Sequence, residues 1–405
     1  MDLYSGLPFW IVKNALHDYF RPLEEDLNVE VAIIGSGITG SLVAHELCTA
    51  GIECAVFDKR TLSTGSSSAS TAQLQYEIDI PLYAMIPMLG EQAAVDAYFA
   101  SLQSIDRIEE VFGSIGADPD FERVPTVFAA HDKRGLIMLE KEFKARQRAG
   151  LPVEFLDKAA LWTGYKINGT GALKNDRSAQ MDCYKGATEI LKYHQKNIRL
   201  AIYSPTGIAT YNRLRQGYEL ITDDGNKVKC NYLIIAAGFE AGKFLPKKVM
   251  DLNSTYVAIS QQVHAELLWP ERCLYWNTEE PYYYMRTTKD NRMIIGGEDV
   301  SFRDPIKRDL LLRNKTKKLE KRFAKIYPDT PFVVDMAWCG TFSSTKDGLP
   351  YIGSWPDDPH MLFALGYGGN GITFSMIAAE VLKNIILGQP DPRVDLFGFE
   401  RKHLR

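Results

Sequence analysis

Three glycines near the start of the sequence have the spacing of a dinucleotide-binding loop. Gly35, Gly37 and Gly40 form the pattern GxGxxG. In this pattern the first glycine permits a tight turn, the second lets the backbone approach a pyrophosphate, and the third lets a helix pack closely on a strand. Asp58 follows at a spacing that suits hydrogen bonds to ribose hydroxyls. The pattern predicts a bound dinucleotide, either FAD or NAD, with a purely structural glycine turn as the alternative.

The elements predicted around these residues are those that such a loop requires. The short apolar run 29–34 is typical of a buried parallel strand, and 38–49 has the apolar pattern of a helix. A second strand over 53–57 ends beside Asp58, so the whole segment is predicted to form a βαβ unit. The helix N-terminus would offer unpaired N–H groups to the phosphates, which makes the purely structural alternative the weaker one.

The rest of the chain divides into helical and strand-like stretches. A chain of 405 residues is long for one hydrophobic core, which favours two domains. The predicted helices are 87–111, 137–148, 184–195, 305–326 and 372–387. The predicted strands are 199–203, 218–222, 227–230, 232–237 and 361–365, together with an aromatic, strand-rich region over 256–295.

Composition and charge exclude several classes of partner. Lys and Arg number 47 against 51 Asp and Glu, so the formal charge is -4, and without a block of like charge the sequence predicts no nucleic-acid partner. We expect no membrane span and no signal peptide. The six cysteines form neither a CxxC pair nor a cluster at metal-ligand spacing, which predicts free thiols, no bound metal and a cytoplasmic location.

Three further segments carry small residues and glycines. The first is the run Lys59 to Leu74, and the second is the strand 233–238, which ends in Gly238. The third leads to the glycine loop 366–371 and includes Trp338, Gly340, Thr345, Asp347, Gly348, Pro350, Ile352 and Gly353. With the N-terminal loop, and in the same order along the chain, these segments resemble the D-amino acid oxidase superfamily, especially its glycine oxidase and sarcosine oxidase branch.

The resemblance implies an α/β fold of two interleaved domains with FAD as the cofactor. A Rossmann-like FAD-binding domain of the GR2 flavoprotein type would comprise 1–85, 176–250 and 336–405. An α+β substrate domain on a mostly antiparallel sheet would comprise 86–175 and 251–335. The residues expected to bind FAD are Gly35, Gly37, Ile38, Gly40, Asp58, Lys59, Ser66, Ser67, Ser68, Thr71, Ala72, Gln73, Leu74, Ile208, Ala237, Gly238, Gly340, Gly366, Gly369, Asn370, Gly371, Ile372 and Thr373.

The resemblance also implies a reaction. A small-molecule amine or amino acid would lose hydride from the carbon bearing nitrogen to flavin N5, and water would hydrolyse the resulting imine. Sarcosine oxidase relatives tether the flavin through a cysteine whose position is Gly340 here, with Cys339 one place earlier, so we expect non-covalent FAD. Their oxygen-activating lysine is matched by Ile294, which leaves O₂ or another electron acceptor open and mildly favours a dehydrogenase.

The carboxylate anchors of these relatives are missing. Glycine oxidase relatives use an arginine where this chain has Phe342, and sarcosine oxidase relatives use a lysine where it has Thr373. A simple amino-acid substrate is therefore in doubt, and a carboxylate facing the substrate would suit a cationic polyamine or amino sugar. The residues expected to face the substrate are Tyr282, Arg286 and Glu298, with Asp299 beside them. A surface arginine and ordinary loop charge are the alternatives for these positions.

Other functions stay open from the sequence. The flavin could oxidise a hydroxy acid, another non-amine metabolite or a modified nucleoside on RNA, although the absence of a basic stripe argues against RNA. A non-catalytic flavin-binding protein is a further alternative. Tyr76 and Glu77, just beyond the run of small residues, could also reach the open face of the flavin. The sequence does not indicate the oligomeric state.

Overall fold

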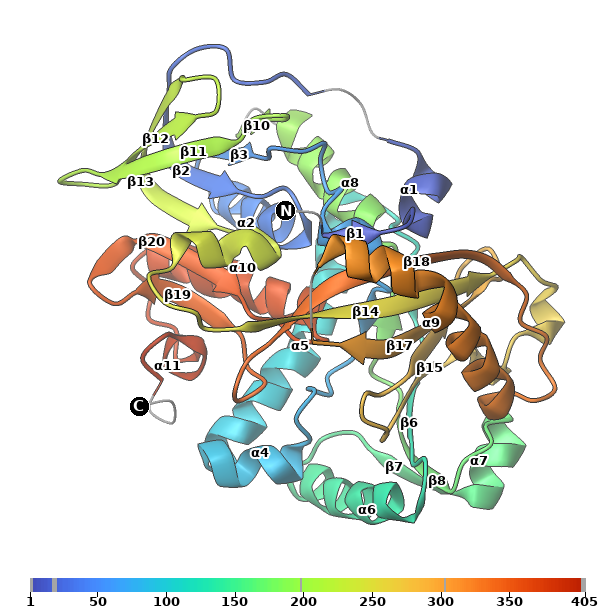
Figure 1. Cartoon of the computed structure of the whole chain (residues 1–405). Coiled ribbons are helices and arrows are strands. Elements are labelled where there is room, and N and C mark those ends of the chain that lie inside the picture. Colours follow the sequence, from blue (N-terminus) through green and yellow to red (C-terminus); the bar gives the residue numbers. More distant parts are fainter. Residues whose placement is uncertain (1–2, 17–19, 197–198, 302–303, 402–405) are drawn as a thin grey trace.

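The computed structural model describes residues 3–16, 20–196, 199–301 and 304–401, which form two large sheets with helices packed around them (Figure 1). One sheet has eight strands. Six follow one another as β10 (Leu200–Tyr203), β3 (Cys54–Phe57), β2 (Leu27–Ile34), β13 (Lys227–Ile235), β12 (Tyr218–Thr222) and β11 (Ile208–Arg213). Beyond them, β20 (Asp358–Leu365) pairs with the end of β13 and with β19 (Tyr351–Trp355).

The centre of this sheet is parallel and buried on both faces. Strands β2, β3 and β13 run parallel, and their apolar residues alternate between two cores. Val31 and Ile33 face the helices, whereas Ala32 faces the opposite core. Burial on both sides explains why these strands are short continuous runs of Val, Ile and Ala, as parallel strands usually are.

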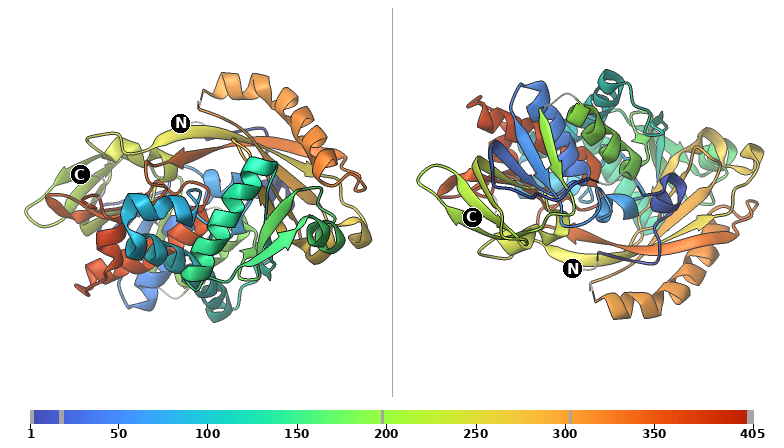
Figure 2. Two further views of the ribbon diagram at one scale, coloured as in Figure 1. Left: turned by 90° about the horizontal axis from the view of Figure 1, so that it is seen from below. Right: turned by 90° about the horizontal axis from the view of Figure 1, so that it is seen from above.

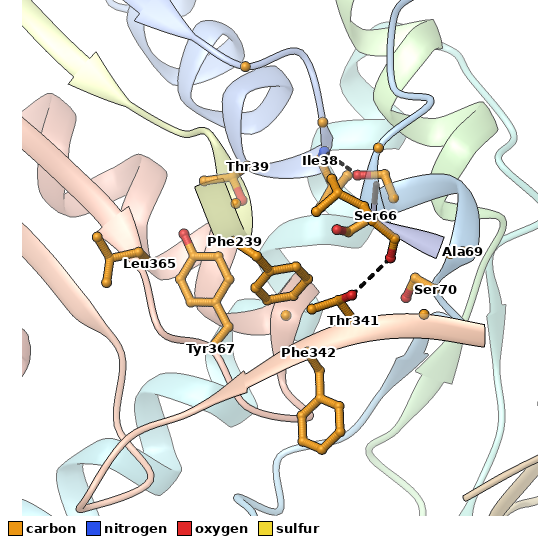
Figure 3. Close-up of a pocket in the computed structure, with 18 of the residues that line it drawn as sticks. Ile38, Thr39, Ser66, Ala69, Ser70, Phe239, Thr341, Phe342, Leu365 and Tyr367 are labelled. Carbon is orange, nitrogen blue, oxygen red and sulfur yellow. Dashed lines mark hydrogen bonds between the residues drawn. The ribbon is translucent and has the colours of Figure 1, made fainter. Parts of the chain in front are cut away.

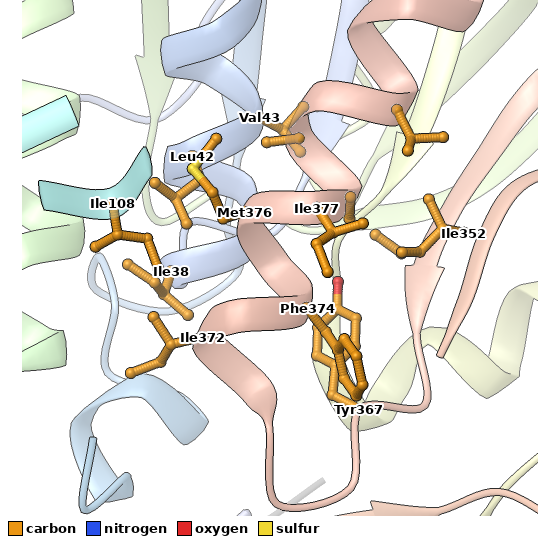
Figure 4. Close-up of a cluster of buried hydrophobic side chains, with 14 of the residues drawn as sticks. Ile38, Leu42, Val43, Ile108, Ile352, Tyr367, Ile372, Phe374, Met376 and Ile377 are labelled. Atoms are coloured by element: carbon orange, nitrogen blue, oxygen red, sulfur yellow. The ribbon is translucent and has the colours of Figure 1, made fainter. Parts of the chain in front are cut away.

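Three helices cover one face of the eight-stranded sheet, α2 (Ile38–Thr49), α8 (Cys183–Lys196) and α10 (Gly371–Ile386). A fourth helix, α5 (Glu91–Ile115), packs against α10 and α8. Figure 4 shows Ile38 and Leu42 of α2 facing Ile372 and Met376 of α10, which joins the first and last glycine loops through one core. Because α2 is enclosed by its neighbours, its side chains from Ile38 to Cys48 are all buried.

The second sheet has nine strands and is almost entirely antiparallel. Its order is β1 (Tyr4–Ser5), β18 (Val334–Ser344), β14 (Asp251–Ser260), β17 (Met293–Val300), β16 (Tyr284–Thr287), β15 (Leu274–Asn277), β6 (Thr126–Ala129), β8 (Gly171–Asn175) and β7 (Glu154–Asp157). The pair β15 and β6 is parallel. Helix α9 (Pro305–Ile326) lies along the outer face of this sheet (Figure 2) and packs Leu319 and Phe323 against it.

Shorter elements connect these layers. A small sheet contains β4 (Gln73–Leu74), β9 (Ala179–Gln180) and β5 (Glu122–Arg123). The remaining helices are α1 (Phe9–Asn14), α3 (Ser66–Ala69), α4 (Leu82–Leu89), α6 (Lys133–Arg148), α7 (Lys158–Tyr165) and α11 (Arg393–Phe397), with 3-10 turns η1 (Gly238–Phe244), η2 (Ala265–Leu267) and η3 (Pro270–Arg272). No helix in the described ranges is both long and apolar enough to cross a bilayer.

The predicted α/β fold, with a Rossmann-like unit beside a mostly antiparallel sheet, is confirmed. Two details differ. The helix predicted over 87–111 is split into α4 and α5 at Gly90, whose φ of 88° breaks a right-handed helix. The strands predicted over 227–230 and 232–237 form the single strand β13.

The division of the chain into two domains stays a prediction. Strands β1 and β18 lie within the ranges assigned to the FAD-binding domain, 1–85 and 336–405, yet both pair within the nine-stranded sheet. The two sheets are therefore linked by the same stretches of chain.

Candidate functional site

A large cavity lies where the C-terminal ends of β2 and β3 approach the inner side of β18 (Figure 3). The rings of Phe239 and Tyr367 project into it between Ser66 and the strand that carries Thr341. The cavity has a volume of about 340 Å³. This falls in the range of roughly 300–1,000 Å³ that is usual for pockets that bind small molecules and cofactors.

The first glycine loop forms one wall of the cavity. Gly35 has a φ of 114°, and a Cβ there would lie 2.4 Å from the Ala236 carbonyl oxygen. A Cβ on Gly37 would lie 2.9 Å from the Ser67 hydroxyl. The N-cap residue Gly37 has no side chain, and the Ile38 N–H donates to the Ser67 hydroxyl at 2.9 Å, so the positive dipole end of α2 lies at the cavity wall. This wall suits a pyrophosphate.

Asp58 is held in place at the end of β3. Its carboxylate accepts hydrogen bonds from the Ser36 N–H at 2.9 Å, the Ser36 hydroxyl at 2.6 Å and the Arg60 N–H at 2.9 Å. It also lines the cavity. A carboxylate fixed in this way can still accept ribose hydroxyls, because each oxygen has more than one lone pair.

The cationic side chains among the described lining residues gather at one place. Lys59 and Arg60 form ion pairs with Glu240 at 2.7 and 2.8 Å, and Lys243 lies 3.6 Å from the same carboxylate. Burial opposes ionisation here, but hydrogen bonds from Lys59 and Arg60 lower the pKa of Glu240 to about 2. Three cationic side chains share one carboxylate, so this end of the cavity keeps an excess of positive charge that suits phosphate groups.

The run of small residues and the N-terminus of α10 continue the lining beside the first glycine loop, since Ser67 forms a hydrogen bond with Ile38 and Ser375 forms one with Thr39. Gly371 and Ile372 line the cavity, and the N-cap residue Asn370 makes no side-chain cap, so the dipole of α10 also points inward. The Ser66 hydroxyl and the Gln73 amide nitrogen are buried on this lining without a hydrogen-bond partner among the described residues. Unpaired buried polar groups indicate that a polar ligand completes this wall.

Most of the residues expected to bind FAD line this cavity. Those that do so are Gly35, Gly37, Ile38, Asp58, Lys59, Ser66, Ser67, Thr71, Ala72, Gln73, Ile208, Ala237, Gly238, Gly340, Gly366, Gly369, Gly371 and Ile372.

Five others lie behind the cavity wall. Gly40 lets α2 pack on β2, since a Cβ there would lie 1.9 Å from the Gly35 oxygen. Leu74 belongs to the core. The remaining three are held by the backbone, because Ser68 donates to Gly65, Thr373 donates to Asn370, and Asn370 donates to Glu77. None of the five is among the residues that line the cavity, and their contact with FAD stays a prediction.

A second compartment, which we call the substrate chamber, opens from the same cavity. The Tyr282 hydroxyl donates to Asp79 at 3.2 Å, and the Gly369 N–H donates to the same carboxylate at 2.8 Å. The hydroxyls of Thr255 and Tyr284 lie 3.0 Å apart. The chamber is defined by Asp79, Thr255, Trp276, Tyr282, Tyr284 and Asp299, all of which line the cavity.

Both acids of the chamber have raised pKa values. Asp79 is exposed to the cavity, but the surrounding protein desolvates it and raises its pKa, against the hydrogen bonds from Gly369 and Tyr282. Burial, together with the charge of Asp79, raises the pKa of Asp299 to about 6. Perturbed carboxylates in a cavity are typical of functional sites.

The placement of Arg286 does not support the expectation that it faces the substrate. It is buried outside the cavity lining, and its guanidinium donates to the carbonyls of Thr71, Ala72 and Met181 at 2.7, 3.0 and 2.8 Å. Its ring neighbour is Trp10, at 5.4 Å. Arg286 therefore fixes the run of small residues from behind.

Glu298 also points away from the chamber. Its carboxylate accepts from Tyr283 at 2.6 Å and pairs with Lys315 at 2.9 Å. A bulge in β17 separates it from Asp299, because the pairing with β14 slips between Gly297 and Val300 and Glu298 adopts a φ of 58°. The bulge turns Glu298 outward and Asp299 inward.

Tyr76 and Glu77 do not line the cavity either. Glu77 accepts from Arg146 at 2.9 Å and from Asn175 at 2.6 Å, inside the protein. Asp79, which does line it, was missed by sequence reasoning although it follows Glu77 by two residues. The sequence shows only that Asp79 is a carboxylate close to the run of small residues. Because the backbone around it is irregular, the sequence does not predict where its side chain points.

A family model described as FAD dependent oxidoreductase, named DAO, matches residues 30–385. This chain belongs to the DAO family. It is 25% identical to gamma-glutamylputrescine oxidoreductase of Escherichia coli, covering 93% of this chain and 88% of that protein. It is 23% identical to glycine oxidase of Bacillus subtilis, covering 89% and 93%.

Solved structures of other flavoproteins share the fold. Glycine oxidase from Geobacillus kaustophilus aligns with a TM-score of 0.77 at 19% identity, covering 93% of this chain and 99% of that chain. L-proline dehydrogenase from P. horikoshii aligns with a TM-score of 0.77 at 17% identity, covering 94% and 100%.

The DAO-family chain is therefore an FAD-dependent oxidoreductase. Its cavity fits FAD. The first glycine loop and Asp58 would hold the pyrophosphate and a ribose, while the unpaired Ser66 and Gln73 groups and the N-terminus of α10 would meet the flavin end.

Proposed function

We propose that this DAO-family enzyme oxidises the C–N bond of an amine that carries no carboxylate beside the reacting carbon. The observation that carries the proposal is the charge of the substrate chamber. Its ionisable acids are Asp79 and Asp299, and the cationic side chains among the described lining residues all lie beside Glu240 at the nucleotide end. A carboxylate in the chamber would meet like charge, whereas an ammonium group would meet opposite charge.

The two positions that hold carboxylate anchors in relatives support the same substrate class. Phe342 lines the cavity with an apolar ring. Thr373 is buried, and its hydroxyl donates to the Asn370 carbonyl at 3.0 Å. Neither can form the charged, bidentate contact that an arginine makes with a carboxylate.

The names of related proteins support C–N oxidation. Among those similar to this chain are a gamma-glutamylputrescine oxidoreductase, glycine oxidases, an L-proline dehydrogenase and L-amino acid deaminases. An L-alpha-glycerophosphate oxidase also shares the fold, with a TM-score of 0.73 at 13% identity, so the fold by itself does not select amines. The charge of the chamber is the observation that supports an amine substrate.

The chemistry divides between the cofactor and the chain. FAD, when bound, would supply the acceptor for a hydride from the carbon next to nitrogen; the nitrogen would release a proton, and water would convert the imine to a carbonyl compound and free amine or ammonia. The Asp79 and Asp299 carboxylates hold and orient the cationic amine. The N–H groups at the start of α10 stabilise negative charge at the flavin end. Two electrons finally pass to O₂ or another electron acceptor.

We also propose that FAD is bound without a covalent link to the protein. Cys339 is 0% exposed and lies outside the cavity lining, where Gly340 takes its place. Burial raises the pKa of the Cys339 thiol to about 12, which keeps it protonated and unreactive.

Anaerobic reduction of the purified yellow protein tests the proposed substrate class. Matched pairs that differ by one carboxylate, such as butylamine with norvaline and ethylamine with alanine, are mixed with the enzyme and the loss of visible flavin absorbance is followed. We expect the amine of each pair to reduce the flavin at least about tenfold faster, which corresponds to about 1.4 kcal/mol.

Three outcomes would contradict the proposal. If the amino acid of each pair reduces the flavin faster than the amine, the substrate carries a carboxylate beside the reacting carbon. Reduction by 2-hydroxy acids or glycerol phosphate, and not by amines, would place the chemistry on a C–O bond. Flavin that dithionite reduces but no metabolite does would indicate a non-catalytic flavin-binding protein.

A further inference from the structure

The two carboxylates of the substrate chamber come from separate elements and are held differently. Asp79 precedes α4 and is fixed by the Gly369 N–H and the Tyr282 hydroxyl, at 2.8 and 3.2 Å. Asp299 comes from the bulge of β17 and interacts with Thr255. Both raise the pKa of Tyr282, so this tyrosine lies within electrostatic range of each of them.

The charge of Asp299 is not matched by a close cation among the described residues. The nearest lysine of this region, Lys315, gives its ammonium group to the carbonyl and the carboxylate of Glu298, at 2.8 and 2.9 Å. One oxygen of Asp299, Oδ1, has no hydrogen-bond partner among the described residues. Burial of an ionised carboxylate with an unpaired oxygen costs free energy unless a cation forms an ion pair with it.

Aromatic rings complete the surroundings of both acids. Tyr282 lies with its ring centre 5.9 Å from that of Trp276 and 6.0 Å from that of Tyr284. Trp276 is 4% exposed, lines the cavity and has no hydrogen-bond partner for its indole N–H among the described residues. Ring faces attract ammonium groups, and they cover the methylene groups of a carbon chain equally well.

We propose that the chamber selects a substrate with two ammonium groups, an α,ω-diamine or polyamine, with one nitrogen held by Asp79 and a second by Asp299. This inference rests on the proposed function, since it names the substrate class of the same site. The two carboxylates offer a binding group to each of two positive charges, and the aromatic rings that line the same chamber would contact the carbon chain. A monoamine would leave one carboxylate buried without a counter-charge.

The first experiment compares diamines with monoamines of equal chain length on the holoenzyme. Putrescine is tested against butylamine, and cadaverine against pentylamine, with flavin reduction followed under anaerobic conditions. We expect kcat/KM for the best diamine to exceed that of its monoamine at least about tenfold. The comparison keeps the carbon chain constant and changes one charge.

The second experiment removes each charge in turn. D299N and D79N should each lower kcat/KM for the diamine about tenfold to a hundredfold, mainly through KM, and D299N should reduce the ratio of diamine to butylamine kcat/KM. The matched control is E298Q, which removes the neighbouring carboxylate of the same bulge but not one that faces the chamber. Its diamine preference should equal that of the wild type.

The outcomes separate this inference from the proposed function. If monoamines and diamines reduce the flavin equally well, or if E298Q loses the preference as D299N does, the two-charge recognition is wrong while amine oxidation stands. If no amine reduces the flavin of the wild type, both are wrong. Retention of FAD by each variant, read from its visible spectrum, shows that the cavity has formed.

Discussion

Asp299 is a titratable group whose charge state changes close to neutral pH. Its pKa of about 6 arises from burial and from the charge of Asp79. The other titratable or charged groups near it are Glu298, Lys315, Tyr282, Tyr284 and Cys339. The tyrosine hydroxyls and the thiol have raised pKa values and stay protonated near pH 6, so they do not titrate with Asp299.

The pH profile of diamine oxidation should report this group. An acid with a raised pKa is neutral below that value, so cation binding by Asp299 is lost as the pH falls through about 6 and gained as it rises. We expect kcat/KM for a diamine to fall up to about tenfold per pH unit below 6 and to level off above it. Steady-state kinetics between pH 5 and 8 measure the effect.

The D299N variant provides the comparison for this profile. An amide does not titrate, so the step near pH 6 should disappear, whereas E298Q should keep it. A step that persists in D299N would assign the titration to another group, with Asp79 the first candidate because its pKa is raised as well.

Single residues differ in how far the sequence predicts them. Gly35 and Gly37 were predictable because their function depends on the backbone, which a spacing of glycines reveals. Arg286 and Glu298 were both expected to face the substrate. In the structure Arg286 faces the protein interior, and Glu298 faces the lysines of α9. The direction of these two side chains depends on the register of the strands and on a bulge, and neither can be predicted from the pattern of residues.

Helix α2 contributes both to the core and to the cavity. Its N-terminus faces the cavity, and its length packs against α10 and α8. Gly40 sits where the first turn of α2 meets the glycine loop. The βαβ unit containing α2 was predicted residue by residue, since strand, loop and helix follow one another locally. The nine-stranded sheet was predicted only in outline, because its strands pair across long separations in sequence.

Substitution of Gly40 should therefore affect folding and FAD binding together. In G40A the new Cβ would lie 1.9 Å from the Gly35 oxygen, so helix and loop must separate. We expect a loss of unfolding free energy of about 3 kcal/mol, as for overpacked cores, and a colourless or weakly coloured protein. Thermal unfolding and the ratio of flavin to protein absorbance measure the two effects.

Gly113 in α5 offers the matched control. It is also a helical glycine, but a Cβ there would meet nothing within 4 Å, and the position is exposed. G113A should leave FAD content unchanged and stabilise the protein by up to about 1 kcal/mol. If G40A and G113A have the same stability and the same FAD content, close packing does not explain the glycine at position 40.

For the molecule as a whole, the cavity is a junction between the two sheets. Its lining comes from the loop after β2, from η1, from β18 of the other sheet and from the N-terminus of α10. A ligand in the cavity thus contacts segments that are far apart in the sequence. A ligand that binds only the folded state should stabilise the protein by an amount that rises with the logarithm of ligand concentration.

Removal of FAD should consequently lower the stability of the entire chain. Because we expect no covalent link, acid should release the flavin into the supernatant. The colourless protein should unfold several degrees lower than the holoenzyme, and excess FAD should restore about 4 kcal/mol at a thousandfold excess over Kd. FMN should restore much less, since Asp58 and the first glycine loop would stay unoccupied. Colour that remains with the precipitated protein would instead indicate a covalent flavin.

The bulge at Glu298 and Asp299 has a consequence for how related enzymes could diverge. Two adjacent carboxylates lie on either side of one backbone irregularity, and only the inward one meets the chamber. Replacing Asp299 by a neutral or a basic side chain would remove or reverse the charge presented to the substrate. The hydrogen-bonded sheet, the cofactor loops and the core would all be left as they are. Substrate charge in this fold is therefore open to change by steps that cost little stability.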